Sequence, residues 1–315
     1  MTTMGSHMSN FTVVRDQSVP PWEDTVKVPR LKVIWRGRAI TALSQSDYRA
    51  YLYPVFTPAG VPVTAEAPAD HPHHQSITVG TDRLDCIIEL PEPYSNTFVE
   101  ATHNFWSNET FSGRAPSRII SKSVEDVEIS DDHLRLVQKL EWQGPPQWGE
   151  SDSVVVADET RTIDVFPGQT ANIIDVRSQL KPTKWDLRIG PTVHAYFTVR
   201  LADGLRVVDG GTLVDSEGRK TAKEIRGQCA DWVDGSGKAS HGYSAGVAVF
   251  NHPSMRNSLW HLDDWGKLSA NPFISAGEPI SRGEALDLSV RIVAHDGDVT
   301  DARIDELYVA FMKSL

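Results

Sequence analysis

The stretch that determines the fold class is residues 154–180, VVVADETRTIDVFPGQTANIIDVRSQL. Apolar and polar residues alternate through both halves, and β-branched residues are frequent, which is typical of strands with one buried face. The segment between the halves contains Pro167 and Gly168, which favour a turn because proline fixes φ and glycine tolerates positive φ. The pattern predicts two strands separated by a turn.

Similar segments recur along the rest of the chain. They occupy residues 31–37, 51–56, 118–129 and 133–142. No repeat of fixed period is visible, which argues against a propeller or a solenoid. Strands that follow one another without intervening helices bury their apolar faces by packing two sheets together. We therefore predict an all-β fold, a large antiparallel β-sandwich of the supersandwich or jelly-roll-like kind.

The C-terminus differs, because residues 299–315 have the pattern of a helix. Apolar residues from Ile304 to Leu315 recur at helical spacing, and Thr300 is positioned to act as the N-cap. We expect this C-terminal helix to pack its apolar stripe on the sandwich or on a partner. Residues 1–10 are interpreted as a disordered expression tag, so the predicted single domain covers residues 11–315.

Charge and composition argue against several classes of partner. The 315 residues include 31 Lys and Arg against 42 Asp and Glu, a formal net charge of −11 that disfavours nucleic acid and anionic membranes. No apolar stretch reaches the roughly 20 residues that span a bilayer. The two cysteines form no CxxC pattern, so we expect a reducing, cytoplasmic location. Sandwiches with large flat faces commonly dimerise, which makes a homodimer an alternative to a monomer.

The main candidate for a functional site is Asp70–Gly80, DHPHHQSITVG, which carries three of the eleven histidines. Pro72 prevents a helix here and favours an extended chain. His71 and His73 would then face one side and His74 the other, a spacing that suits an acid/base pair or two ligands of one divalent metal ion. The alternative is a polar loop in which the imidazoles only cap backbone groups.

Further histidines stand beside aromatic and polar residues in later segments. Residues far apart in sequence can converge on one sheet face of a sandwich, so these side chains are candidates to complete one substrate site, although each histidine alone is more often structural. His194 joins His71 and His73 as a candidate acid or base. The substrate-binding candidates are His74, His103, Tyr196, Asn251, His252, His261, Asn271 and Trp265.

The sequence ETRT places Glu159 and Arg161 on one face of a strand. One interpretation is a structural ion pair. The other is a carboxylate base beside a guanidinium that neutralises an anionic intermediate. Glu159 also completes the candidate metal set with His71 and His73, and no dinucleotide or nucleotide motif indicates any other cofactor. The nine tryptophans favour a sugar site, where ring faces cover C–H groups, although several must fill the core of a large sandwich.

Several phrases occur in an order that is similar to a known family. They are YPVFTPAGVPVT, DHPHHQSI, ADETRTIDV, GVAVFNHPSMRN and WHLDDWGKLSANPF, within about residues 30 to 300. Together they resemble a bacterial domain family labelled "methane oxygenase PmoA", and Gln75 stands where its relatives frequently carry another histidine. The resemblance implies a sugar-pathway protein associated with oxidoreductases that make 3-keto-sugars. Residues 194–204, HAYFTVRLADG, also resemble the His-aromatic stretch of aldose-1-epimerases, whose fold is a β-supersandwich.

The leading hypothesis is a carbohydrate-active lyase that cleaves an oxidised glycoside, such as a 3-keto-glycoside, by β-elimination with histidines as acid and base. Its partner would be a small saccharide substrate. The alternatives are a mutarotase-type epimerase, a non-catalytic sugar- or metal-binding module, and a cupin-like metal oxygenase. The candidate catalytic residues are His71, His73, His194, Glu159 and Arg161.

Overall fold

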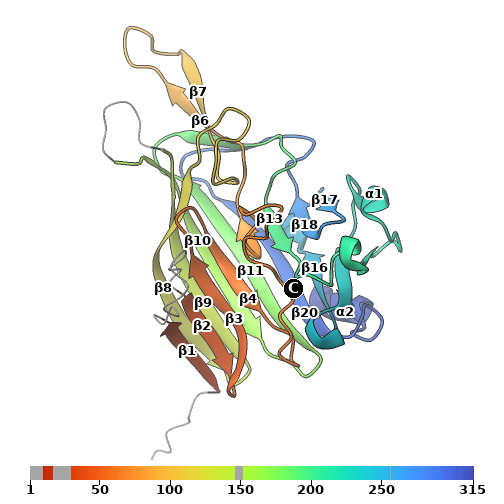
Figure 1. The fold of residues 1–315 in the computed structure, drawn as a ribbon. Helices are drawn as coiled ribbons and strands as arrows, with labels where there is room; N and C mark the ends of the chain where they lie inside the picture. The colour runs from red at the N-terminus through yellow and green to blue at the C-terminus, as the bar shows by residue number, and fades with distance from the viewer. Residues whose placement is uncertain (1–9, 17–29, 146–151, 256) are drawn as a thin grey trace, which may run out of the picture.

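The chain folds into antiparallel β-sheets that lie against one another in layers (Figure 1). This computed structural model describes residues 10–16, 30–145, 152–255 and 257–315. Residues 1–9 of the stretch interpreted as a tag lie outside the described residues. The described part confirms an all-β sandwich with a C-terminal helix.

The first sheet has eight strands and contains the N-terminal part of the chain. Its second half joins strands that are distant in sequence, because β5 pairs with β13, and β13 in turn pairs with β18. In spatial order the strands are β1 (Phe11–Asp16), β2 (Arg30–Trp35), β3 (Arg38–Gln45), β4 (Ala50–Val55), β5 (Ile77–Val79), β13 (Phe197–Arg200), β18 (Lys267–Asn271) and β17 (Leu259–Asp263).

The second sheet also has eight strands and includes the hairpin predicted from residues 154–180. In this hairpin Phe166 pairs with Ile173, next to the turn. In spatial order the strands are β14 (Thr212–Asp215), β15 (Trp232–Lys238), β16 (Ser244–Asn251), β20 (Leu286–Asp296), β11 (Ala171–Pro182), β10 (Val155–Phe166), β9 (His133–Gln143) and β8 (Arg118–Ser130).

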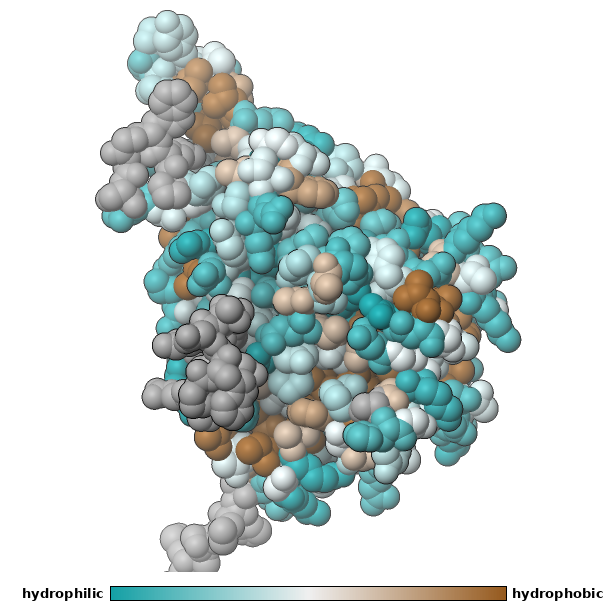
Figure 2. Space-filling view, viewed as in Figure 1, coloured by the Kyte–Doolittle hydropathy of each residue, from teal (hydrophilic) through white to brown (hydrophobic). Residues whose placement is uncertain are grey.

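A smaller sheet of four strands carries a projecting hairpin. Its strands in spatial order are β19 (Glu278–Ile280), β12 (Asp186–Ile189), β6 (Leu84–Glu89) and β7 (Phe98–His103). Figure 1 shows β6 and β7 extending away from the two large sheets. Apolar surface gathers on this hairpin in Figure 2, where Tyr94, Phe98 and Val99 are exposed.

The core lies between the two large sheets, and alternation along the strands determines which residues enter it. In β10 the buried face includes Ala157, Ile163 and Val165. Trp142 and Trp260 are the largest fully buried side chains, so these two tryptophans fill the core. Burial of such apolar side chains stabilises the fold by about 1.5–3 kcal/mol each.

The helices in the described residues are short, and none is long and apolar enough to cross a membrane. The C-terminal helix buries Ile304 and Phe311 in a second apolar cluster with Phe250 of β16. The prediction of Thr300 as the N-cap was wrong, because the helix begins at Ile304 and Arg303 is its N-cap residue. The backbone N–H of Thr300 donates to Asp298 in the turn before the helix. The helical elements are α1 (Ala222–Ile225), α2 (Ile304–Ser314), η1 (Val207–Asp209), η2 (Ser240–Gly242) and η3 (Pro253–Met255).

Candidate functional site

Five histidines from three segments form what we call the histidine cluster: His71, His73, His74, His194 and His261. The ring centroids of His73 and His74 lie 4.4 Å apart, and those of His71 and His74 lie 4.9 Å apart. The ring centroids of His194 and His261 are 5.8 Å apart. The expected convergence of these distant histidines is therefore present in the structure.

Two tryptophans connect the members of the cluster. The ring of Trp106 lies 5.7 Å from that of His74 and 5.5 Å from that of His194. Trp265 stacks on His71 at 4.1 Å and on His74 at 5.2 Å between centroids. The imidazoles and indoles thus form one surface of aromatic rings, which is suited to the apolar faces of a sugar ring.

Strand order explains why these segments meet. The DHPHH loop leads into β5, His194 precedes β13, and His261 and Trp265 belong to β17 and the turn that follows it. These strands lie at one end of the first sheet, in the order β5, β13, β18, β17. Within the loop, the backbone N–H of His74 donates to the carbonyl of His71 at 2.9 Å, which sets the imidazoles side by side.

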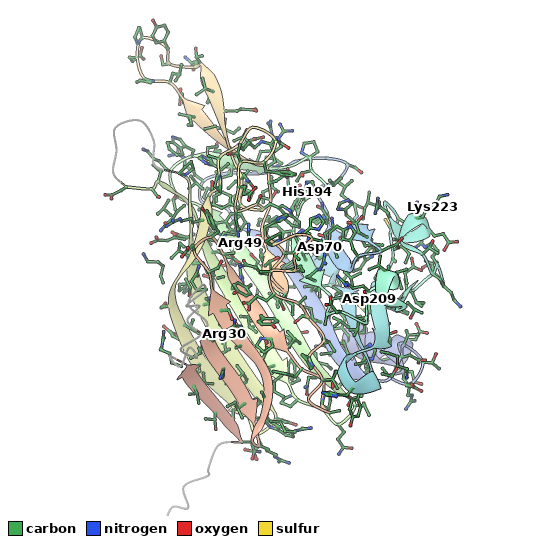
Figure 3. The ribbon with its side chains drawn as sticks, viewed as in Figure 1. Arg30, Arg49, Asp70, His194, Asp209 and Lys223 are labelled. Carbon is green, nitrogen blue, oxygen red and sulfur yellow. The ribbon has the colours of Figure 1, made fainter. Side chains whose placement is uncertain are left out.

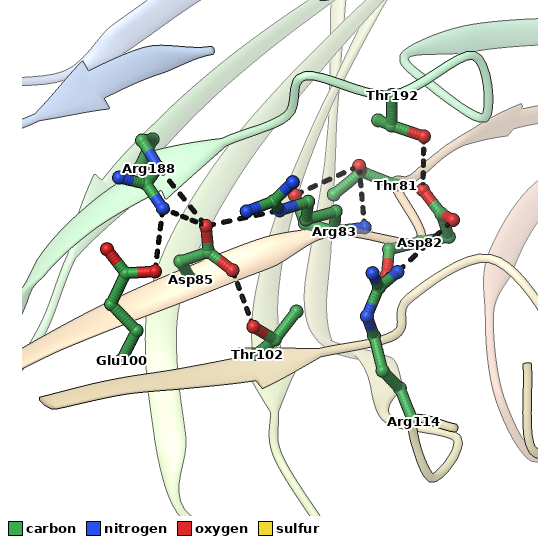
Figure 4. Close-up of polar contacts among 9 residues, drawn as sticks. All are labelled: Thr81, Asp82, Arg83, Asp85, Glu100, Thr102, Arg114, Arg188 and Thr192. Carbon is green, nitrogen blue, oxygen red and sulfur yellow. Dashed lines mark hydrogen bonds and ion pairs between the residues drawn. The ribbon is translucent and has the colours of Figure 1, made fainter. Parts of the chain in front are cut away.

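His194 is paired with a buried carboxylate. Its Nδ1 lies 3.6 Å from Oδ2 of Asp82, whose side chain is only 7% exposed. Asp82 also accepts hydrogen bonds from Thr192 and from Arg114, the latter at 3.3 Å (Figure 4). Although burial opposes ionisation, the contacts with His194 and Thr192 lower the pKa of Asp82. An ionised Asp82 favours the proton on Nδ1 of His194, which leaves Nε2 of that ring as a base.

His261 has the opposite arrangement, because a cation contacts its Nδ1. Lys267 Nζ donates to this nitrogen at 2.8 Å and also lies 3.2 Å from Asp263. Burial, and then the charge of Lys267, lower the pKa of His261 to about 4. The ring is therefore neutral near pH 7 with its proton on Nε2, which makes it a hydrogen-bond donor.

Two further imidazoles of the cluster, those of His73 and His74, are also held neutral. Burial lowers the pKa of His73 to about 4, and the charge of Arg49 contributes to that shift. Burial likewise lowers the pKa of His74, whose Nδ1 has no partner among the described residues. Burial lowers the pKa of Arg49 itself to about 9. Figure 3 shows Arg49 in the same part of the molecule as His194.

A salt bridge fixes the DHPHH loop against the first sheet. Nη2 of Arg200 donates to both carboxylate oxygens of Asp70 at 2.7 Å, and Asp70 Oδ2 lies 3.1 Å from Nδ1 of His71. The guanidinium of Arg200 also lies 4.6 Å from the ring centroid of Trp265. Although burial opposes it, these hydrogen bonds lower the pKa of Asp70 to about 2. One carboxylate thus holds two of the groups that stack on Trp265.

Glu159 and Arg161 form a different network, inside the core. Arg161 donates to both oxygens of Glu159 at 2.9 Å, and Trp142 Nε1 and Ser178 Oγ each donate at 2.8 Å. Tyr196 joins through the Ser178 hydroxyl at 2.9 Å. Both members of the ion pair are almost fully buried. The structure does not bring these candidates to the histidine cluster, and we assign them a structural role.

His103 and Asn271 also lie in structural positions. His103 is buried beside Phe105, and its Nε2 has no partner within the described ranges. Asn271 donates to the carbonyl of Thr192 at 2.8 Å and accepts from the N–H of Phe273 at 2.8 Å. Asn271 therefore holds the segment that precedes His194.

Asn251 and His252, two further candidates, line a separate cavity of about 510 Å³ beside α2. The candidate metal set is not assembled either. In the part of the chain that the structure describes, no three or more His, Cys, Asp or Glu side chains are grouped to hold a metal ion, and this includes His71, His73 and Glu159.

Four residues of this site are not among the candidates predicted from the sequence: Asp82, Trp106, Arg200 and Lys267. Trp106 follows the candidate His103 by three residues, and Lys267 follows the candidate Trp265 by two. Closeness in sequence to a candidate could therefore have indicated both residues. No local pattern pointed to Asp82, because its pairing with His194 depends on the tertiary fold.

The chain belongs to a family that is defined by sequence, described as "Family of unknown function (DUF6807)", whose model matches residues 34–309. This description does not support the methane oxygenase label. No curated protein matches the chain.

Two solved structures that match this chain are an α-galactosidase and a galactose mutarotase related enzyme. The GH36 α-galactosidase AgaA of Geobacillus stearothermophilus is 10% identical with a TM-score of 0.41, and the match covers 92% of this chain and 41% of that one. This chain thus spans less than half the length of that enzyme. A galactose mutarotase related enzyme of Lactobacillus acidophilus is 5% identical with a TM-score of 0.35, and the match covers 90% of this chain and 97% of that one.

Proposed function

We propose that this protein is a carbohydrate-active lyase that cleaves an oxidised glycoside, such as a 3-keto-glycoside, by β-elimination. The observation that carries the proposal is the pairing of His194 with buried Asp82 beside a neutral imidazole, His261, and the indole ring of Trp106. Such a site places a proton acceptor, Nε2 of His194, beside a proton donor, the Nε2–H of His261.

His194 is the general base in this proposal. The carboxylate of Asp82 orients the imidazole and stabilises the imidazolium that forms when Nε2 takes a proton. The side chain of His194 is 27% exposed, so substrate can reach it. Asp82 acts through His194 and is therefore a positioning residue.

His261 stabilises the negative charge that develops on the substrate. Removal of the proton at C2 of a 3-keto-sugar produces an enolate whose charge lies on the C3 oxygen. The Nε2–H of neutral His261 is a donor for such an oxygen, because Lys267 occupies Nδ1. Removing one donor of this kind from an active site typically costs about 10²–10³ in kcat.

The reaction balances without a redox partner. The C2–H bond breaks and its proton passes to Nε2 of His194. The electron pair then forms the C1=C2 double bond as the bond between C1 and the glycosidic oxygen breaks. The departing oxygen takes up this proton from the His194 imidazolium, which returns the imidazole to its neutral form. The products are an alcohol and an unsaturated 3-keto-sugar.

The aromatic surface supports a saccharide as the substrate. Trp265 is half-buried, and the cationic groups of Arg200 and Lys267 lie 4.6 and 5.5 Å from its ring centroid. Sugar rings stack on indoles through their C–H faces, while polar groups at the edge bind the hydroxyls. Cations around the ring favour the enolate over the neutral ketone.

The test is proton NMR in D₂O with a panel of 3-keto-glycosides and the unoxidised glycosides as controls. We expect loss of the anomeric signal with a new vinylic signal from the hydrogen at C1 of the product, or entry of deuterium at C2 of substrate that is not yet cleaved. Exchange of anomers without bond cleavage would replace the proposal with a mutarotase. An unchanged spectrum with every oxidised glycoside would refute catalysis on this substrate class.

Two matched histidine–aspartate pairs make the residue test specific. His194→Gln is expected to lower kcat by about 10²–10⁴. The control is His133→Gln. Nε2 of His133 lies 2.7 Å from the carboxylate of Asp164, and neither residue belongs to the histidine cluster. His133→Gln should leave turnover unchanged. Full turnover in His194→Gln would remove His194 from the mechanism.

A further inference from the structure

A second cavity lies apart from the histidine cluster. It has a volume of about 510 Å³ and is lined by the end of β16, by η3 and by α2, and none of its lining residues belongs to the cluster. Figure 1 shows α2 next to β16 and β20. Tyr308 of α2 packs on Phe250 of β16 at 5.4 Å between ring centroids, which fixes one wall of the cavity.

Two polar groups of this cavity lack partners. Oδ1 of Asn251 and Oγ of Ser258 are buried atoms that make no hydrogen bond to any described residue. The amide nitrogen of Asn251 donates to the carbonyl of Ala230 at 3.0 Å, so its oxygen is held in place. Buried polar atoms in proteins are nearly always hydrogen-bonded. An acceptor and a hydroxyl left unpaired in one cavity therefore indicate a ligand.

The other polar groups supply both donors and acceptors. Nδ1 of His252 accepts from the backbone N–H of Ser254 at 3.0 Å, so the proton of the neutral ring lies on Nε2. Burial lowers the pKa of His252, which favours that neutral form. Among the described lining residues, the charged groups are the carboxylates of Glu217 and Asp231.

We propose that this cavity is a second binding site, for a neutral, hydroxyl-rich ligand such as a saccharide unit. Vicinal hydroxyls donate to Asp231 and to Asn251 Oδ1 and accept from His252 Nε2, and the ring of Tyr308 covers an apolar sugar face. An adjacent cavity of about 570 Å³ shares Cys229 and Asn257 with it, so a ligand of more than one ring has room to continue.

Methionine methyl NMR is a sharp test, because both Met255 and Met312 line the cavity. The chain has five methionines, and the other three lie within residues 1–8. Protein labelled with ¹³C at the methionine methyl groups is titrated with maltose, cellobiose, lactose and trehalose. At least one is expected to shift the Met255 and Met312 signals in a saturable manner, more strongly than glucuronate does.

Variants assign the binding to this cavity. Asp231→Asn and Ser258→Ala should each weaken the binding at least fivefold. Glu306→Gln should not, because Glu306 lies on α2 but outside the lining of the cavity. The variant His194→Gln should bind as the unmodified chain does, which separates this site from the proposed reaction. Absence of shifts with all four sugars, stronger shifts with glucuronate, or unchanged affinity in both cavity variants would each overturn the proposal.

Discussion

Replacing Glu159 by Gln tests whether the buried network is structural or catalytic. Glu159 accepts four hydrogen bonds, two of them from Arg161. Nη1 of Arg161 donates to the carbonyl of Ala50 at 3.0 Å. The substitution keeps the shape of the side chain and removes its charge, so it leaves a buried guanidinium without its counterion. Breaking a buried ion pair in this way costs about 3–5 kcal/mol.

The loss of unfolding free energy can be expressed as a decrease in melting temperature. An unfolding entropy of about 2.1 cal/mol/K per residue gives about 0.66 kcal/mol/K for 315 residues. A loss of 3–5 kcal/mol in unfolding free energy then lowers the melting temperature by about 5–8 °C. Differential scanning calorimetry measures this shift, and urea denaturation followed by tryptophan fluorescence measures the free energy.

An exposed ion pair serves as the control for Glu159→Gln. Glu141 pairs with Lys122 at 3.2 Å on the neighbouring strands β9 and β8. Its substitution by Gln should cost less than about 1 kcal/mol, because solvent screens the charges. A loss below about 1 kcal/mol for Glu159→Gln would refute the reasoning. So would a variant of unchanged stability that has lost turnover, since Glu159 would then take part in the chemistry.

Three further outcomes follow from the site and the core. Lys267→Met removes the cation on Nδ1 of His261, so the pKa of His261 should rise from about 4, measured by NMR titration of the ring protons. Trp265→Ala removes the stacking surface and should raise KM for saccharides about tenfold, while kcat changes less. Although burial opposes protonation, Asp234 raises the pKa of His295. The pair therefore stabilises the fold below the ordinary histidine pKa, and this contribution is lost as the pH rises through the pKa of His295 in the folded protein. Urea unfolding from pH 5 to 9 measures this fall in the free energy of unfolding, which should be absent in His295→Gln.

Strands were predictable where alternation and turns coincide, as in the hairpin of β10 and β11. Which face of a strand is buried was not predictable. Glu159 and Arg161 alternate with Thr160 and Thr162 in a pattern that any half-exposed strand could show. Only the packing of a second sheet decides that the face carrying Glu159 and Arg161 is the buried one. Local sequence fixes the period of a strand, whereas burial depends on its neighbours.

The same limit applies to the histidines. His71, His194 and His261 meet because β5, β13, β18 and β17 are adjacent, a strand order that joins segments up to about 200 residues apart. His103 and His252 have similar local surroundings in sequence, yet His103 enters the core and His252 lines another cavity. The local motif therefore predicted the loop at residues 70–74. Which distant histidines join that loop depends on the order of the strands in the sheet.

Charge explains why so many histidines can serve one site in an acidic protein. The net charge of −11 would raise histidine pKa values if it acted on the cluster. Instead burial, together with Arg49 and Lys267, lowers the pKa values of His73 and His261 to about 4. Burial first, and then these cations, keep the imidazoles of His73 and His261 neutral, so these two rings can act as donors and acceptors at neutral pH. The ring of His194 lies instead beside Asp82, whose carboxylate offers a counterion to the imidazolium that forms when a proton is taken from substrate.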